Sequence, residues 1–155
     1  MTREVSVRRA SEADAGDVAR LLHDFNTEFD DYVPELPVLT ERVRRHVENE
    51  ESTFLLVGAG PDGVAQLRFR ASLMLDGLEA YLQELYVAPA LRGKGLGRAL
   101  LEAVMEEARS RGAVWMDLGT SEDDAAARGL YESLGFTNRE NGPDAPIMYV
   151  YERAL

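Results

Sequence analysis

One stretch of the sequence, "LQELYVAPALRGKGLGRALLEAV" at residues 82–104, constrains the fold more than any other part. Its first part is rich in strand-forming residues and ends at Pro89. Its last part repeats apolar residues at helical spacing, and Gly112 follows as a stop signal. The helical face consists of Leu96, Ala99, Leu100, Ala103, Val104 and Ala108. The sequence therefore predicts a strand, a glycine turn and an amphipathic helix in direct succession.

The rest of the chain shows the same two periodicities. An alternating segment predicts a first strand at 5–9, and Ser11 with Asp14 makes a capping-box-like helix start. The later predicted elements are a short helix at 40–49, two strands within 52–75 joined by a Gly-Pro-Asp-Gly turn, a strand at 79–89, a strand at 113–120 covered on both sides, a helix at 123–134 capped by Ser121, and a final strand at 147–155. This order predicts a mixed α/β fold in which helices cover a central sheet.

Composition limits the classes of protein that fit. The 155 residues, 45% of them hydrophobic, suit one globular domain spanning 1–155. The chain carries 28 Asp and Glu against 17 Lys and Arg, so its net charge of -11 repels nucleic acids and anionic membranes. Cysteine is absent, which excludes disulfides, thiolate metal sites and a cysteine nucleophile. Because there is also no long apolar run or signal-peptide pattern, we expect a cytoplasmic protein without a nucleic-acid or membrane partner.

The glycine turn carries the first functional signal. Between Glu84 and Glu102 there is no acidic residue, whereas Arg92, Lys94 and Arg98 are basic. Glycines at a helix start let an anion approach the backbone N–H groups. The Walker pattern is not matched, because no Ser or Thr follows the Gly-Lys pair, and the glycine spacing is not that of a dinucleotide fingerprint. The turn is therefore either a phosphate site of another kind or only a tight, soluble connection.

This stretch, together with "ARGLYESLGF" at residues 127–136, resembles the GNAT superfamily of acyl-CoA-dependent N-acetyltransferases. The family signature of Arg or Gln, two residues, Gly, one residue, then Gly or Ala maps onto Arg92, Gly95 and Gly97. The resemblance implies a GNAT-like α/β fold. Its central sheet is mixed, mostly antiparallel, covered by helices, and splayed between the fourth and fifth strands.

The resemblance also implies a cofactor, acetyl-CoA, and the residues that hold it. Backbone N–H groups of the turn would bind the pyrophosphate, and the strand before the turn would pair with pantetheine. The implied cofactor-binding residues are Leu85, Tyr86, Val87, Arg92, Gly93, Lys94, Gly95, Leu96, Gly97, Arg98, Asp124 and Tyr131. Family members often have Asn at the position of Asp124, so its amide donor is missing here. The thioester oxygen would be met by a strand N–H, that of Val87.

Glu84 is the candidate general base. An alkyl ammonium with a pKa of about 10.4 is protonated at neutral pH, so the acceptor needs a base or a desolvating pocket. Strand alternation places Leu82, Glu84 and Tyr86 on one face. Some family members carry the carboxylate one position earlier, which is Gln83 here and cannot accept a proton. The other interpretation is that Glu84 only pairs with a cation or is solvated.

Tyr131 is the candidate acid. It matches the tyrosine that protonates the departing coenzyme A thiolate in many family members, and a phenol with a pKa of about 10 carries its proton at neutral pH. The alternative is a core aromatic that packs with its neighbours in "LYESLGF".

The acceptor site is predicted around "HDFNTEFDDYVPELP" at residues 23–37, which contains five acids and no Lys or Arg. Acids and aromatics together suit a cationic amine. The candidate substrate-binding residues are Phe25, Phe29, Asp30, Tyr32 and Glu84. The competing interpretation is an ordinary acidic surface. His23 and His46 have no further ligands at metal-site spacing, so no metal is expected.

These observations predict an N-acetyltransferase that moves an acetyl group from acetyl-CoA to a primary amine by direct transfer in a ternary complex. The acceptor would be a cationic small molecule or a peptide lysine. The alternative is a non-catalytic acyl-CoA-binding or sensing module; a toxin that acetylates charged tRNA is disfavoured by the net charge. The acceptor's identity and the length of the acyl group stay open. A homodimer is compatible with this fold, although no interface is identified.

Overall fold

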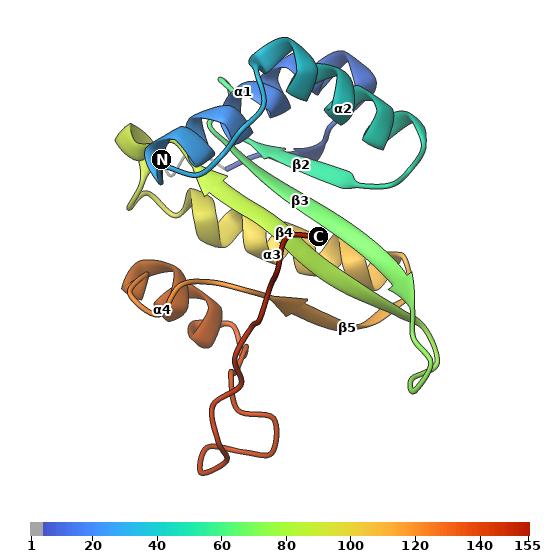
Figure 1. The fold of residues 1–155 in the computed structure, drawn as a ribbon, viewed down its shortest axis with the longest axis vertical. Coiled ribbons are helices and arrows are strands. Elements are labelled where there is room, and N and C mark those ends of the chain that lie inside the picture. Colours follow the sequence, from blue (N-terminus) through green and yellow to red (C-terminus); the bar gives the residue numbers. More distant parts are fainter. Residues whose placement is uncertain (1–4) are drawn as a thin grey trace. The chain divides into compact units, whose positions relative to one another are not determined.

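The computed structural model describes residues 5–155 and divides the chain into two compact units. The first unit runs to Leu118 and the second begins at Gly119. Every strand of the described chain belongs to the first unit, and the second contains one α-helix and the C-terminal segment (Figure 1).

The first unit is built on a five-stranded sheet in the order β1-β2-β3-β4-β5. The strands are β1 (Val7–Arg9), β2 (Thr53–Val57), β3 (Gly63–Ala71), β4 (Leu78–Val87) and β5 (Ala113–Leu118). All neighbours pair antiparallel except β4 and β5, which are parallel. Parallel neighbours need a long crossover, which the predicted helix after the glycine turn supplies. The predicted mixed, mostly antiparallel sheet is confirmed.

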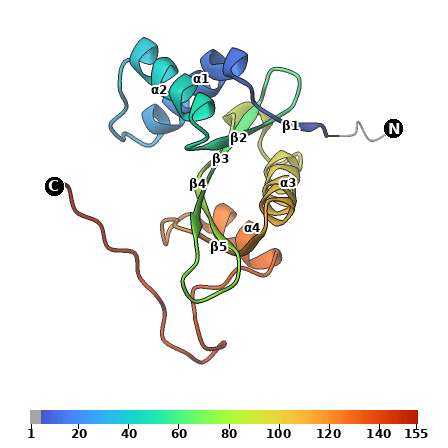
Figure 2. The same cartoon turned by 90° about the vertical axis from the view of Figure 1, so that its right-hand side faces the viewer.

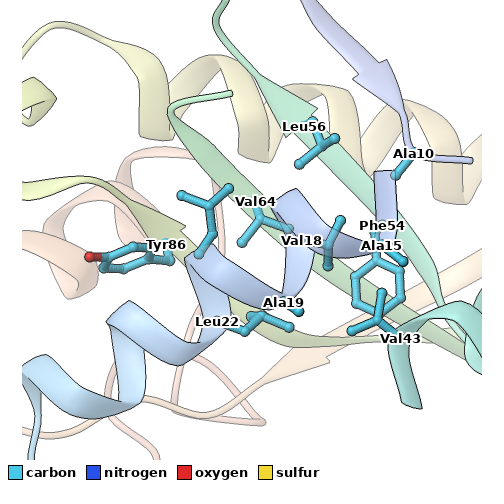
Figure 3. Packing of buried hydrophobic residues seen from close by; sticks show 11 residues of the cluster. Ala10, Ala15, Val18, Ala19, Leu22, Val43, Phe54, Leu56, Val64 and Tyr86 are labelled. Atoms are coloured by element: carbon cyan, nitrogen blue, oxygen red, sulfur yellow. The ribbon is translucent and has the colours of Figure 1, made fainter. Parts of the chain in front are cut away.

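Helices cover both faces of this sheet, as predicted (Figure 2). α1 (Ala15–Glu28) and α2 (Leu36–Glu48) lie on one face, and α3 (Leu96–Ser110) lies on the other. Under α1, a buried cluster joins Val18 and Leu22 to Phe54, Val64 and Tyr86 (Figure 3). α3 buries its own apolar stripe of Leu100, Leu101, Val104 and Ala108. Removal of these side chains from water is the main stabilising contribution to the unit.

The start of α2 differs from the prediction. The helix begins at Leu36 rather than at Thr40, and Pro37 lies within its first turn. Prolines interrupt many helices, because the residue has no backbone N–H to donate. In the first turn, however, its missing N–H removes no intrahelical hydrogen bond, and its fixed φ already suits a helix.

β4 contains an irregularity that strand alternation does not predict. Leu67 of β3 pairs with Leu82, whereas its neighbour Gln66 pairs with Glu84, so Gln83 is an extra residue in a β-bulge. Because Gln66 and Leu67 face opposite sides of the sheet, their partners Glu84 and Leu82 also face opposite sides. The prediction that Leu82 shares a face with Glu84 is therefore wrong.

β4 and β5 pair along the first half of β4 and are unpaired beyond it. Their last register pair is Leu82 with Leu118, and β4 continues to Val87 after β5 has ended. This confirms the predicted separation between the fourth and fifth strands. β5 itself is not covered on both faces, because Val114 is 51% exposed and Trp115 is 55% exposed. An apolar run predicts a strand, but it does not supply the neighbours that would cover both faces.

The second unit contains α4 (Ala125–Ser133), which is shorter than the predicted helix. Its N-cap is Asp124, whose carboxylate accepts a hydrogen bond from the N–H of Ala127 at 3.0 Å, and not the predicted Ser121. Gly135 follows with a φ of 91°, the left-handed conformation that commonly ends a helix.

The predicted final strand does not form. Residues 147–155 lie in no strand, although the N–H of Met148 donates to the carbonyl of Asn138 at 2.8 Å within the second unit. A segment of high strand propensity needs a partner edge before its backbone groups can pair. In the described part of the chain, no helix is both long and apolar enough to cross a membrane.

Candidate active site

The end of β4 presents a backbone edge without a strand partner in the described chain. β5 ends opposite Leu82, so the following residues of β4 pair with β3 alone. The N–H of Ala88 donates to the carbonyl of Asp62 at 2.9 Å, which fixes the direction of the alternating backbone groups. The N–H and C=O groups of Leu85 and Val87 therefore point away from β3. The C=O of Val87 accepts a hydrogen bond from the side chain of Arg92. An extended ligand could pair with the N–H groups of Leu85 and Val87 and with the C=O of Leu85, as an additional strand would.

The glycine turn joins this edge to α3. Gly93 and Gly95 have φ values of 77° and 82°, a left-handed region that side chains rarely adopt. Gly95 is the N-cap of α3 and has no side chain to accept from the first helical N–H groups. A Cβ added at Gly93 or Gly95 would meet nothing within 4 Å, so space above the turn is open. The predicted glycine turn before a helix is confirmed.

The side chain of Arg92 contacts residues of α1 and β4. Its Nη2 lies 2.7 Å and 3.1 Å from the two carboxylate oxygens of Glu28 at the end of α1. Its Nε donates to the carbonyl of Val87 at 3.0 Å, and its Cζ lies 5.5 Å from the ring centroid of Tyr86. Arg92 thus links α1, the last residues of β4 and the glycine turn.

Glu84 is half-buried and lies on the side of the sheet that α1 covers. Tyr86, two residues further along β4, lies on the same side and is buried. Burial raises the pKa of the Glu84 carboxyl above its ordinary value, and the negative charge of Asp31 raises the pKa further. A carboxylate with a raised pKa is a stronger base than an ordinary one once it has lost its proton. This carboxyl is therefore suited to remove a proton from an amine.

The predicted acceptor residues lie at and after the end of α1. Phe25 is half-buried, and its ring centroid lies 5.0 Å from that of Tyr86, so it contributes to the core. Phe29 is 52% exposed and Tyr32 is 87% exposed, and Asp30 has a left-handed φ of 59° just beyond α1. The structure brings Phe25 and Phe29 together, with centroids 5.3 Å apart, and leaves Tyr32 open to solvent.

Two residues of this region were not singled out from the sequence. Glu28 is 64 positions away from its partner Arg92 in the chain, and Asp31 acts on Glu84 from a different element. Both belong to the acidic segment at 23–37, whose composition was the only available signal. Composition identifies such a segment but not the cation or carboxyl that each acid meets.

In the second unit, Tyr131 lies on α4 with its ring edge-on to Phe136, at a centroid distance of 6.1 Å. Both side chains are half-buried, so this ring contact is compatible with the packing role that the sequence left as an alternative to a catalytic one. The carboxylate of Asp124, a candidate cofactor residue, caps α4 through the N–H of Ala127.

Comparison with known proteins agrees with this geometry. The model of the acetyltransferase (GNAT) family matches residues 18–136, a range that includes the glycine turn and Tyr131. YhfO of Bacillus subtilis, named an uncharacterized N-acetyltransferase, is 30% identical over 85% of this chain and 89% of its own length. The alanine N-acetyltransferase of ribosomal protein bS18 from Salmonella typhimurium is 47% identical over 37% of this chain and 39% of its own.

A crystal structure of an Arthrobacter sp. FB24 protein assigned to the acetyltransferases has a TM-score of 0.88 and 41% sequence identity. That similarity covers 99% of this chain and 98% of the other. The family match extends over most of the chain and includes both sequence motifs, and the sheet separates where the family's does. The chain belongs to the GNAT acetyltransferase family.

Proposed function

We propose that this protein transfers an acetyl group from acetyl-CoA to a primary amine, directly and within a ternary complex. The observation that carries the proposal is the free edge of β4, which runs into a glycine turn and has a desolvated carboxyl, Glu84, beside it. One element thus combines a surface for an extended ligand, an anion site and a base.

The turn and the strand edge suit coenzyme A. The N–H groups of residues 92–98 would hold its pyrophosphate, aided by the positive end of α3 and by the charges of Lys94 and Arg98. The open space at Gly93 and Gly95 fits a ligand that approaches the backbone closely. Leu85 and Val87 would pair with pantetheine, and the N–H of Val87 is the donor for the thioester oxygen. Bound acetyl-CoA supplies an activated acyl group.

Glu84 would take the proton of the acceptor amine. The desolvated carboxylate has a raised pKa, which narrows the gap to the ammonium pKa and so makes proton removal less unfavourable. Tyr131 would return a proton to the thiolate of coenzyme A, because the tyrosine matches the family motif and a phenol is protonated at neutral pH.

The acceptor is proposed to be a cationic amine, either a small molecule or a peptide lysine. Asp30 and Tyr32 are exposed just beyond α1, and Asp31 is close enough to Glu84 to affect its pKa. Negative charge and aromatic faces attract ammonium groups. The name of the bS18 relative gives an alanine of a protein as its acceptor, which supports an amine acceptor in general.

The alternative function is an acyl-CoA-binding module without transfer chemistry. Such a module would need the free strand edge and the glycine turn, but it would not need a carboxyl with a raised pKa. The raised pKa of Glu84 favours the enzyme, because desolvating a carboxyl is costly and gives no advantage to cofactor binding.

The experiment that tests the function measures coenzyme A thiol release from acetyl-CoA with a panel of polyamines, aminoglycosides, amino acids, arylamines and lysine peptides. We expect release with cationic amines and little with neutral or anionic ones. If the protein binds acetyl-CoA but releases no thiol with any of them, the binding-module alternative is favoured and the proposed transfer to these amines is contradicted.

Substitution Gly95→Ala should weaken coenzyme A binding about tenfold. The φ of 82° strains an L residue by about 1–2 kcal/mol, and the turn must shift to relieve it. The matched control is Gly16→Ala in α1, where an added Cβ also meets nothing within 4 Å and φ is not positive. Titration calorimetry with coenzyme A checks both variants. Equal affinity of Gly95→Ala and wild type would contradict the assignment of the turn.

Removing the charge of Asp31 should move the acid limb of the pH profile. A base works only when deprotonated, so activity falls as the pH drops through the raised pKa of Glu84. Asp31→Asn removes a cause of the raised pKa, so the limb of kcat/KM should shift to lower pH. Asp30→Asn makes the same charge change one residue away and should leave the limb in place. Glu84→Gln should lower kcat/KM about 100-fold or more. An unmoved limb in Asp31→Asn would argue against Glu84 as the base.

Tyr131→Phe removes the proposed proton donor while keeping the ring that packs on Phe136. We expect kcat to fall about 100-fold, with an affinity for coenzyme A close to that of the wild type. Tyr149→Phe, at a tyrosine that is 74% exposed, is the control and should be fully active. Steady-state kinetics with the best amine of the panel measure kcat for both variants. Full activity of Tyr131→Phe would contradict the proton-donor role and leave this tyrosine with a packing role only.

A further inference from the structure

Arg92 is committed to contacts within the protein, although it is the first residue of the signature turn. Nη2 contacts the carboxylate of Glu28, and Nε contacts the carbonyl of Val87. From these contacts we infer that Glu28 is a positioning residue for the transfer proposed above. It holds Arg92 on the free edge of β4, so that this arginine sets the geometry of the strand end and does not serve as the phosphate-binding cation. The inference rests on the proposed function.

The charges around the turn support different roles for Arg92 and Lys94. A carboxylate 2.7 Å from the guanidinium of Arg92 neutralises it at short range, so little of its charge is left for a pyrophosphate. Lys94 lies in the turn and takes part in no ion pair within residues 5–155. The lysine therefore remains as the cation of the turn whose charge is available to a phosphate.

The position of Glu28 explains why the pair is stable. Glu28 is the last residue of α1, where the helix dipole places partial negative charge and a carboxylate by itself is unfavourable. The guanidinium of Arg92 offsets both the charge of the Glu28 carboxylate and the partial negative charge of the helix end. The guanidinium also lies over the ring of Tyr86, which contacts the ring of Phe25 with centroids 5.0 Å apart. The side chains of Glu28 and Arg92 are 28% and 44% exposed, so the pair contributes modestly to stability and its main effect is orientation.

The peptide group between Val87 and Ala88 is held from both sides. Its carbonyl accepts from Nε of Arg92 at 3.0 Å, and its N–H donates to the carbonyl of Asp62 at 2.9 Å. This peptide follows directly on the N–H of Val87, the proposed donor to the thioester oxygen. Without Glu28, the long side chain of Arg92 loses one of its two polar partners and keeps only the Val87 carbonyl and the Tyr86 ring, so the strand end loses a restraint on its open side.

The Glu28–Arg92 pair also connects the segment proposed to bind the acceptor with the turn proposed to bind the cofactor. α1 leads directly into the exposed acids at 30–31, one of which affects the pKa of Glu84. Arg92 begins the turn that would hold the cofactor. A contact between Glu28 and Arg92 therefore ties the acceptor segment to the strand end where the acetyl group would lie.

The test compares Glu28→Gln with Lys94→Gln in the full chain. For each variant, kcat and KM are measured with acetyl-CoA and the best amine of the panel, and coenzyme A binding is measured by calorimetry at two salt concentrations. We expect Glu28→Gln to lower kcat about tenfold, with coenzyme A affinity and its salt dependence within about threefold of wild type. Lys94→Gln should instead weaken coenzyme A binding about tenfold and reduce its salt dependence, while kcat at saturation is retained.

A conservative variant and a matched acid complete the design. Glu28→Asp keeps the carboxylate on a shorter side chain and should recover part of the lost kcat. Glu48→Gln changes the last residue of α2, which is also a glutamate paired with an arginine, and should behave as wild type. A simple loss of fold in Glu28→Gln would appear as a lowered melting temperature together with lost coenzyme A binding, and Glu28→Asp then provides the decisive kcat comparison.

The outcomes separate the inference from the proposed function. If Glu28→Gln binds coenzyme A several-fold more tightly than wild type, Arg92 is a phosphate ligand that Glu28 restrains, and the inference is overturned. An unchanged kcat in both Glu28 variants overturns it as well. In both cases the wild-type activity still supports the proposed function. A wild type that neither binds coenzyme A nor releases thiol refutes the proposed function and this inference with it.

Discussion

The site depends on one constraint, the early end of the pairing between β4 and β5. Beyond Leu82, β4 has β3 on one side and no strand on the other within the described residues. Unpaired backbone N–H and C=O groups at a sheet edge are costly to bury and ready to bind. Glu84 lies on this strand end, and the glycine turn and Arg92 follow directly after it.

The bulge at Gln83 determines the face of the sheet on which the Glu84 side chain lies. It moves Glu84 to the face of the sheet that α1 covers, where burial and the charge of Asp31 raise the pKa of the carboxyl. Without the extra residue, Glu84 would share the face of Leu82, under α3. A single inserted residue therefore places the carboxyl on the face of α1, where the charge of Asp31 acts on it, instead of on the face that α3 covers.

The basic residues of the glycine turn do not act alike. Arg92 is bound to Glu28 and to the Val87 carbonyl, whereas Lys94 has no such partner in the described chain. The protein has a net charge of -11, with 28 Asp and Glu against 17 Lys and Arg, so acidic partners for a basic residue are plentiful in the chain as a whole. A basic residue in a phosphate-binding pattern can thus have a structural role when it forms an ion pair with a carboxylate of the same protein.

The sequence by itself determined the element types up to α4, the glycine turn and the family, because local periodicity and the need for positive φ at Gly93 and Gly95 are properties of short segments. It also singled out Glu84 and the acidic segment at 23–37 as candidates for the proposed site. Only the tertiary structure decided that Gln83 is a bulge, that Glu28 pairs with Arg92, and that the segment at 147–155 forms no strand. These depend on register, on contacts between distant positions and on the presence of a partner edge. No local pattern encodes them, because each results from packing between elements that the chain brings together only when it folds.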